Sequence, residues 1–348
     1  MNYTLEIQKL LIKSANFSGE DKISILKQAV KLADTNNDVE WGYDLRVDIM
    51  NACMGAIKTT EALPAFVWMI EAYDNNPNFF DPIELLWKYR WMIDSSARSW
   101  KVPLDTINNM LEDFKVRLAD AGISLRSYYG AKINVGFIAE DFKMVEENME
   151  LRNNSEKDNI LDNFGNDLYD NILFKIMTKD TEGALALRHE IPAVPHLDTS
   201  FSINCSFGEY LTRIGEIELA LPFIKQAEEE FSRLEKLNYL SISLSQLIYA
   251  LTKVNPEAAW GYTDQYLNWI FECEDYDMLI YGLNLLPLFK LGGSRKIMLS
   301  HEFKLYRNND FYHIEDLYNY FITIVSDLAA KFDTRNGNET FSNLVKKS

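Results

Sequence analysis

Apolar residues recur at helical spacing along almost the whole chain, and this pattern constrains the fold more than any other feature. In two stretches, Lys22–Asp34 and Ile217–Leu234, they return every three or four positions and form one wide stripe. No long stretch alternates polar and apolar residues with period two, so the sequence predicts no sheet. We therefore expect an all-α protein.

The helical pattern also repeats. The segments EALPAF (61–66) and LALPFI (219–224) share Ala-Leu-Pro near a predicted helix start. Proline is tolerated there because the N–H groups of the first helical turn have no partner within the helix. With Ala62 and Ala220 as equivalent positions, and an earlier helix around Ile25, similar second-helix starts can be marked at Thr106, Val145, Ala184, Ala258 and Ile297. Their gaps of 36 to 44 residues predict about seven or eight helical hairpins.

One block resembles a known repeat. Residues 204–227 are similar to a tetratricopeptide repeat, a helix–turn–helix unit of roughly 34 residues. Phe207 and Gly208 stand at the family's Leu-Gly pair, and Gly215 stands at its turn glycine. The small–large–small pattern of the second helix matches Ala220, Ile224 and Ala227. The resemblance implies a right-handed, tetratricopeptide-like α-solenoid, and the alternative is a less regular helical-repeat array.

We expect a single domain over residues 1–348, because stacked hairpins share their contacts and form one continuous body. The polar stretch at 151–167 is a candidate hinge between two halves. The last residues, 334–348, are expected to be a frayed tail or a short terminal helix.

The charge of the chain restricts its partners. It carries 52 acidic and 35 basic residues, a net charge of −17, which argues against nucleic acid because phosphate binding needs concentrated Lys and Arg. An acidic surface instead favours a basic partner, or serves only to keep the protein in solution. We find no signal peptide and no apolar run long enough for a membrane span, so we expect a cytoplasmic protein without membrane contact.

Catalytic and metal-binding patterns are not evident. Cys53, Cys205 and Cys273 lie far apart, and the four histidines lack the i, i+4 pairing of HExxH, so we expect no metal and no cofactor. LGGSRK (291–296) is open to an anion-binding reading, although a loop with Ser294 as N-cap of a following helix is the simpler one. A hydrolase or transferase on a helical scaffold remains the alternative from a different class.

The aromatic stretch Leu85–Trp100 is the most unusual segment of the chain. Aromatic and arginine side chains together are typical of interaction hot spots, but helices packed between neighbours also bury aromatics. From the repeat register we expect Trp87 in the core, and Trp91 with Arg98 in a groove.

The family register implies which residues face the groove, because the first helix of each hairpin lines the concave side. Carried over to this sequence, these positions are Asp44, Asn51, Trp91, Ser95, Arg98, Asn134, Glu209 and Arg213. In the family, groove asparagines hold the backbone of an extended peptide, which is the role implied for Asn51 and Asn134.

These observations predict a non-enzymatic scaffold that binds a protein or peptide in its groove. Two narrower versions stay open: a sensor of signalling peptides that resembles bacterial peptide-responsive solenoid regulators, and an acidic, immunity-type inhibitor of a basic partner. A homo-oligomer formed through apolar end helices such as FITIVSDLAAKF (321–332) is a further alternative.

Overall fold

The computed structural model describes residues 2–56, 59–157, 164–301 and 303–348. The chain folds into two compact units. The first, called here the N-terminal unit, comprises residues 1–97, 105–131 and 156–161, and the second, the C-terminal unit, comprises 98–104, 132–155 and 162–348. The candidate hinge at 151–167 includes residues 158–163, which lie outside the described part of the chain.

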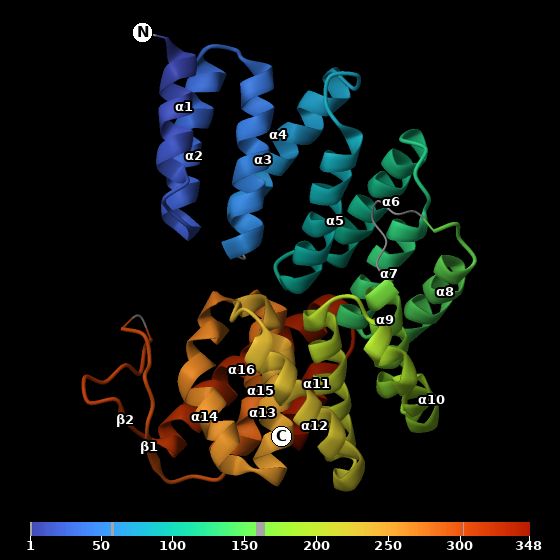
Figure 1. The fold of residues 1–348 in the computed structure, drawn as a ribbon, viewed down its shortest axis with the longest axis vertical. Helices are drawn as coiled ribbons and strands as arrows, with labels where there is room; N and C mark the ends of the chain where they lie inside the picture. Colours follow the sequence, from blue (N-terminus) through green and yellow to red (C-terminus); the bar gives the residue numbers. More distant parts are fainter. Residues whose placement is uncertain (1, 57–58, 158–163, 302) are drawn as a thin grey trace. The chain divides into compact units, whose positions relative to one another are not determined.

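The protein is all-α, as the apolar pattern predicted. Over the described residues there are seventeen α-helices (Figure 1). They are α1 (Tyr3–Ser14), α2 (Gly19–Thr35), α3 (Val39–Ala56), α4 (Thr59–Asn75), α5 (Pro82–Arg98), α6 (Leu104–Asp120), α7 (Arg126–Ala139), α8 (Phe142–Asn153), α9 (Phe164–Met177), α10 (Thr181–Ala186), α11 (Leu197–Arg213), α12 (Ile217–Arg233), α13 (Ser241–Val254), α14 (Pro256–Tyr266), α15 (Asp275–Phe289), α16 (Ile314–Asn336) and α17 (Thr340–Lys347). Short 3-10 segments lie at η1 (Leu187–Ala193), η2 (Asn238–Leu240) and η3 (Leu267–Glu272). Among these helices none is both long and apolar enough to cross a membrane.

The helices are arranged as consecutive hairpins. In the N-terminal unit α1 packs against α2, α2 against α3, and α3 against α4 (Figure 1). In the C-terminal unit α9, α11, α13 and α15 pack in sequence as one row, and α10, α12 and α14 each pack on the first helix of their own hairpin. The first helices of successive hairpins therefore lie side by side along that row.

Most of the second-helix positions marked in the sequence lie inside helices. They fall in α4, α6, α8, α10, α12 and α14, at Ala62, Thr106, Val145, Ala184, Ala220 and Ala258. The start at Ile297 was wrong, because this residue follows a short strand. The chain between α15 and α16 forms a two-stranded antiparallel sheet, β1 (Ser294–Lys296) and β2 (Phe311–His313), with Ser294 opposite His313.

This strand pair also corrects two expectations about the LGGSRK segment. Gly292 and Gly293 adopt φ of 71° and 90°, which ends α15 and turns the chain into β1. Ser294 therefore begins a strand and is not a helix N-cap, and its hydroxyl lies 2.8 Å from Nδ1 of His313. Strands of three residues are too short to produce a visible alternation, so the expectation of no sheet failed here.

Glycines allow close helix contacts at three places in the C-terminal unit. A Cβ atom on Gly208 of α11 would lie 3.1 Å from Ile224 of α12. On Gly136 of α7 it would lie 2.8 Å from Val145 of α8. On Gly282 of α15 it would lie 2.5 Å from Val325 of α16, closer than van der Waals contact permits.

This crowding makes Gly282 sensitive to substitution. Replacing it by alanine is expected to lower the free energy of unfolding by about 1–3 kcal/mol, because Val325 or the helix backbone must shift. The matched control is Gly261 in α14, whose added Cβ would meet nothing within 4 Å. There, alanine should stabilise by up to about 1 kcal/mol through helix propensity. Urea unfolding of both variants tests the pair, and equal changes in midpoint would contradict the close approach.

The C-terminal segment is ordered and docked. Of residues 334–348, for which we expected either a frayed tail or a short helix, the first three complete α16 and eight form α17. The buried Asp333 carboxylate accepts hydrogen bonds from the backbone N–H groups of Phe341 (2.9 Å) and Ser342 (2.8 Å). Phe341 is only 1% exposed. Side-chain amides of Asn336 and Asn338 donate to the carbonyls that end α7, each at 3.1 Å.

Candidate binding cavity

A cavity of about 510 Å³ lies within the C-terminal unit. Its wall is built mainly by α7, α9, α11, α13 and α15, all of them first helices of hairpins, and by α17, with Arg98 at the end of α5 and Phe142 at the start of α8. This volume falls in the range of sites that enclose a small organic molecule or a few residues of peptide. Most of the lining is apolar or aromatic, and includes Phe137, Leu173, Ile242, Ile280, Leu283 and Phe341.

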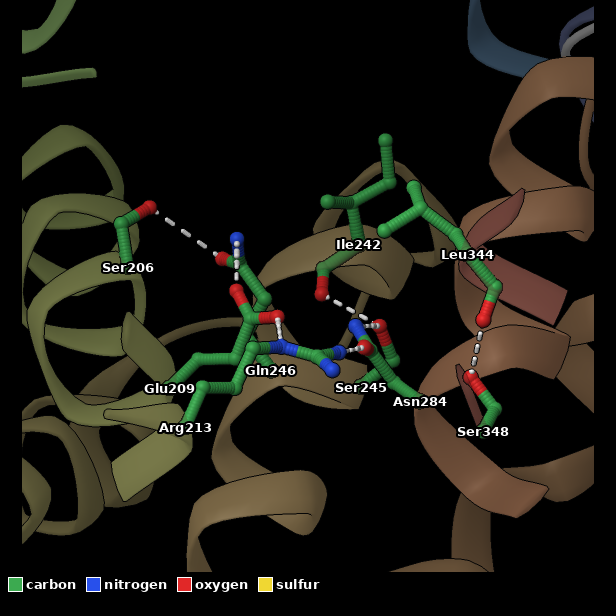
Figure 2. A network of polar contacts seen from close by, with 9 residues as sticks. All are labelled: Ser206, Glu209, Arg213, Ile242, Ser245, Gln246, Asn284, Leu344 and Ser348. Carbon is green, nitrogen blue, oxygen red and sulfur yellow. Dashed lines mark hydrogen bonds and ion pairs between the residues drawn. The ribbon is translucent and has the colours of Figure 1, made fainter. Parts of the chain in front are cut away.

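One side of the wall carries a chain of polar contacts between three neighbouring helices (Figure 2). Arg213 forms an ion pair with Glu209, one turn earlier on α11. Its Nη2 also donates to Oδ1 of Asn284 on α15 at 2.7 Å. From α13, Nε2 of Gln246 donates to Glu209 at 3.1 Å. The network thus joins α11, α13 and α15 through side chains at the same level of the row.

The network continues at both ends (Figure 2). Ser206 donates from its hydroxyl to Oε1 of Gln246 at 3.3 Å. Nδ2 of Asn284 donates to the hydroxyl of Ser245 at 3.0 Å, and Ser245 donates to a backbone carbonyl of its own helix. The Arg213 guanidinium lies 3.9 Å from the ring centroid of Tyr249. With both donors and acceptors engaged, these side chains are held in fixed orientations.

A second group of charged and aromatic side chains surrounds Tyr276. Arg98 forms an ion pair with Asp277, and its Cζ lies 5.9 Å from the Tyr276 ring centroid. Burial raises the pKa of Asp277 and outweighs the opposing effect of Arg98. Tyr276 contacts Phe341 edge to face, with the ring centroids 6.0 Å apart. α17 and α15 therefore meet at an aromatic contact on the cavity wall.

Glu140 lies between α7 and α8 and lines the same cavity. It is partly buried, and its carboxylate makes no hydrogen bond or ion pair with any residue of the described chain. Burial first, and the negative charge of Asp333 second, raise the pKa of Glu140 to about 7. The Glu140 carboxyl is therefore only partly ionised at neutral pH.

The eight residues expected in the groove separate into two sets. Arg98, Asn134, Glu209 and Arg213 all line the cavity of the C-terminal unit. The other four belong to the N-terminal unit, at Asp44, Asn51, Trp91 and Ser95.

In the N-terminal unit these four side chains differ in their surroundings. Asp44 is exposed on α3, and partial burial together with Asp48 raises its pKa. Oδ1 of Asn51 accepts a hydrogen bond from Nζ of Lys88. On α5, Trp91 is partly buried and Ser95 is buried.

Trp87 was expected in the core, but it is 47% exposed, so that expectation was wrong. The residues that fill the α5 face of the core are instead Leu85, Leu86, Tyr89, Met92 and Ile93. Trp87 lies on the opposite side of the helix from most of these positions.

Several cavity residues were not predicted from the sequence, although the repeat spacing contained the signal. Gln246 follows Glu209 by 37 residues, and Asn284 follows Gln246 by 38, which is the hairpin spacing. Glu140 likewise precedes Lys179 by 39 residues, and Lys179 precedes Gly215 by 36. All three of these turn residues have positive φ, of 60°, 64° and 86°. Adding the hairpin spacing repeatedly to one known position, along the first helices and along the turns, would have identified Gln246, Asn284 and Glu140.

No protein-family model matches this chain, and a search of curated proteins finds no significant match. The residues themselves form an array of helical hairpins, with a partly apolar, partly charged cavity among the first helices of the C-terminal unit.

Proposed function

We propose that the protein is a tetratricopeptide-like, non-enzymatic binding scaffold, and that its C-terminal unit takes up a short peptide or a peptide segment of a partner protein. The observation that carries the proposal is the cavity of about 510 Å³ enclosed by the first helices of successive hairpins and α17. Stacked hairpins bind partners on the face formed by their first helices. A cavity of this volume holds a few residues, which favours the peptide-sensing version over the recognition of a folded surface.

The polar groups of the wall suit peptide backbone recognition. Amide side chains of Asn134, Gln246 and Asn284 line the cavity. An amide has two N–H donors and an oxygen with two lone pairs, so Gln246 and Asn284 can bind a peptide in addition to their contacts within the network. They alternate with bulky apolar residues such as Leu173 and Ile280. This mixture fits an extended peptide, whose backbone needs hydrogen bonds and whose side chains need apolar contacts.

Charge pairing favours binding over catalysis. Among the carboxylates of the wall, Asp170 is paired with the buried Arg152, and Glu209 is paired with Arg213. A carboxylate oxygen that is bound by an arginine is less available to a substrate proton. The enzyme alternative would have to rest on Glu140 with the tyrosines or Lys179 of the described lining, which includes no histidine or cysteine.

Filling the cavity tests the proposal. Replacing Ile280 by tryptophan is expected to remove at least about tenfold of the affinity for any peptide that the wild type binds, because the indole occupies the ligand's volume. The control is the same substitution at Ile214, which is 47% exposed and outside the cavity lining. A random hexapeptide pool incubated with wild type and both variants, followed by native mass spectrometry, provides the measurement.

The possible outcomes distinguish cavity binding from its absence. Peptides retained by the wild type and the Ile214 variant but lost by a folded Ile280 variant would support the proposal. Should Ile280→Trp fail to fold, Ile242→Trp on α13 blocks the same cavity from another wall. Equal retention by all folded variants, or no retained peptide at all, would contradict binding in this cavity.

A further inference from the structure

We propose that the cavity selects a cationic ligand, with Glu140 as the counter-ion of an ammonium or guanidinium group carried on an apolar body. This inference rests on the proposed function, because it names the chemistry of what the same cavity binds. The acidic net charge of the chain, −17, would also favour the approach of such a ligand.

Most other charges at the wall are paired within the protein, and the further cation of the lining, Lys179 at the turn between α9 and α10, is exposed to solvent. Arg98 is paired with Asp277, Asp170 with Arg152, and Arg213 with Glu209. Glu140 faces the cavity without any such partner in the described chain. A carboxylate removed from water without a counter-ion is unfavourable, and a ligand cation placed beside it would restore the missing interaction.

The charge that acts on the Glu140 carboxyl is negative. It is that of Asp333 on α16, which raises the pKa of Glu140. Asp333 is held in place because it accepts the first backbone N–H groups of α17. A further titratable group that senses Glu140 is the Tyr276 hydroxyl of α15, which burial keeps neutral by raising its pKa. Two carboxyl groups thus act on one wall position, which attracts a cation and repels an anion.

Aromatic side chains that line the same cavity would add to cation binding. The Tyr276 ring already lies 5.9 Å from the Arg98 guanidinium, and its contact with Phe341 places a second ring at the same wall. Tyr169 of α9 lines the cavity as well. Aromatic faces attract ammonium and guanidinium groups by their quadrupoles, most strongly where water is excluded. A cavity whose wall carries both a carboxylate and aromatic rings is therefore suited to a cation that has lost part of its hydration.

The backbone fixes the position of Glu140 at the turn between α7 and α8. Its φ of 60° belongs to the left-handed region, which Lys179 and Gly215 also occupy at the corresponding turns of the next two hairpins. In this helix C-cap the backbone N–H groups of Glu140 and Asp141 donate to the carbonyls of Phe137 and Gly136. The turn therefore holds the Glu140 side chain at the cavity wall.

Simple amphipathic probes test the charge requirement without knowledge of the natural ligand. We would titrate n-octylammonium, n-octylguanidinium, n-octanol and octanoate into the full-length protein by calorimetry at pH 8. The cations are expected to bind at least about tenfold more tightly than octanol, and octanoate more weakly than octanol. Binding of the cations should weaken on going to pH 5.5, because Glu140 becomes protonated while the probes keep their charge.

Two variants with the same change of charge make the test specific. Glu140→Gln keeps the size of the side chain and is expected to bring the affinity for octylammonium down to that for octanol. Glu146→Gln removes an equivalent charge from an exposed position on α8, outside the cavity lining, and should leave all four affinities unchanged. Equal cation affinity in the wild type and Glu140→Gln, or no preference of the wild type for cations, would overturn the inference.

The source of the cation is distinguished by peptides. Acetylated and amidated hexapeptide pools with one fixed Lys or Arg would be compared with the same pools carrying norleucine at that position. A preference for Lys or Arg that Glu140→Gln abolishes would support a basic peptide side chain as the ligand. Binding of neutral pools with no such preference would leave the proposed peptide function standing and reject the cation. Binding of octylammonium without any peptide would support the cation site and reject the peptide function.

Discussion

At pH 8, replacing Glu140 by glutamine is expected to raise the free energy of unfolding by about 3 kcal/mol, whereas at pH 4.5 it should change little. The reason is the pKa of this carboxyl, which burial and Asp333 raise from 4.5 to about 7. A group whose folded-state pKa lies above its unfolded value stabilises the fold fully only below the unfolded value. The contribution is lost as the pH rises from 4.5 through 7, and glutamine carries no charge to lose.

Urea unfolding between pH 4.5 and 8 provides the measurement for this prediction. Because the chain comprises two units, amide exchange in α15 would report the stability of the C-terminal unit separately. Between pH 4.5 and 8, the free energy of unfolding of the wild type should fall relative to that of Glu140→Gln. The free energy of unfolding of Glu146→Gln should follow that of the wild type. Parallel curves for the wild type and Glu140→Gln would mean that the carboxylate is compensated in the folded protein, and would remove the charge argument for a cationic ligand.

The same substitution is thus expected to stabilise the free protein and to weaken cation binding. A residue that costs stability is more easily explained by binding than by folding. If the cation inference is correct, saturating octylammonium should reverse the order of stability at pH 8. Ligand binding adds stability only to a folded state that binds it, and Glu140→Gln would gain much less.

The hairpin array was predictable because packing imposes residue size at regular intervals. Ala62, Ala184 and Ala220 are fully buried at the second-helix positions that defined the repeat, and Val145 occupies the same place in its hairpin. A larger residue there would separate the two helices. Such local constraints recur with the repeat, so the sequence displays them as a period.

The prediction failed where the array itself ends. Counting onward by the same spacing placed a helix start at Ile297, but Gly292 and Gly293 turn the chain out of α15 before that point. The segment then forms a strand pair that no other hairpin of the described chain contains. A period cannot indicate where it stops, and three-residue strands leave too weak a pattern to replace it.

The candidate cavity could be predicted only in part. The register pointed to Arg98, Asn134, Glu209 and Arg213, which the structure gathers at one cavity although they are spread over more than a hundred residues. It did not point to α17, because this helix returns to the first helices through contacts between distant parts of the chain. Asn336 and Asn338 donate to the end of α7, almost two hundred residues earlier. Contacts of that range leave no periodic signal in the sequence.

The docking of α17 depends on one buried aromatic ring. Phe341→Ala is expected to lower the free energy of unfolding of the C-terminal unit by about 3–5 kcal/mol, since the ring is 1% exposed and contacts Phe332 and Tyr276. The matched control, Leu344→Ala on the same helix, removes a side chain that is 38% exposed and should cost less than about 2 kcal/mol.

Because Phe341 and Leu344 both line the cavity, stability and binding must be measured together. Urea unfolding and amide exchange of α16 and α17 measure how firmly α17 is packed. Titration with octylammonium measures the affinity of the cavity for the probe. If α17 is an integral part of the cavity, Phe341→Ala should lose amide-exchange protection across α17 and bind octylammonium more weakly. Leu344→Ala should keep the exchange protection and change only the affinity for octylammonium. Equal, small losses in both variants would show that α17 is only loosely docked, and that the cavity is bounded by the hairpins without it.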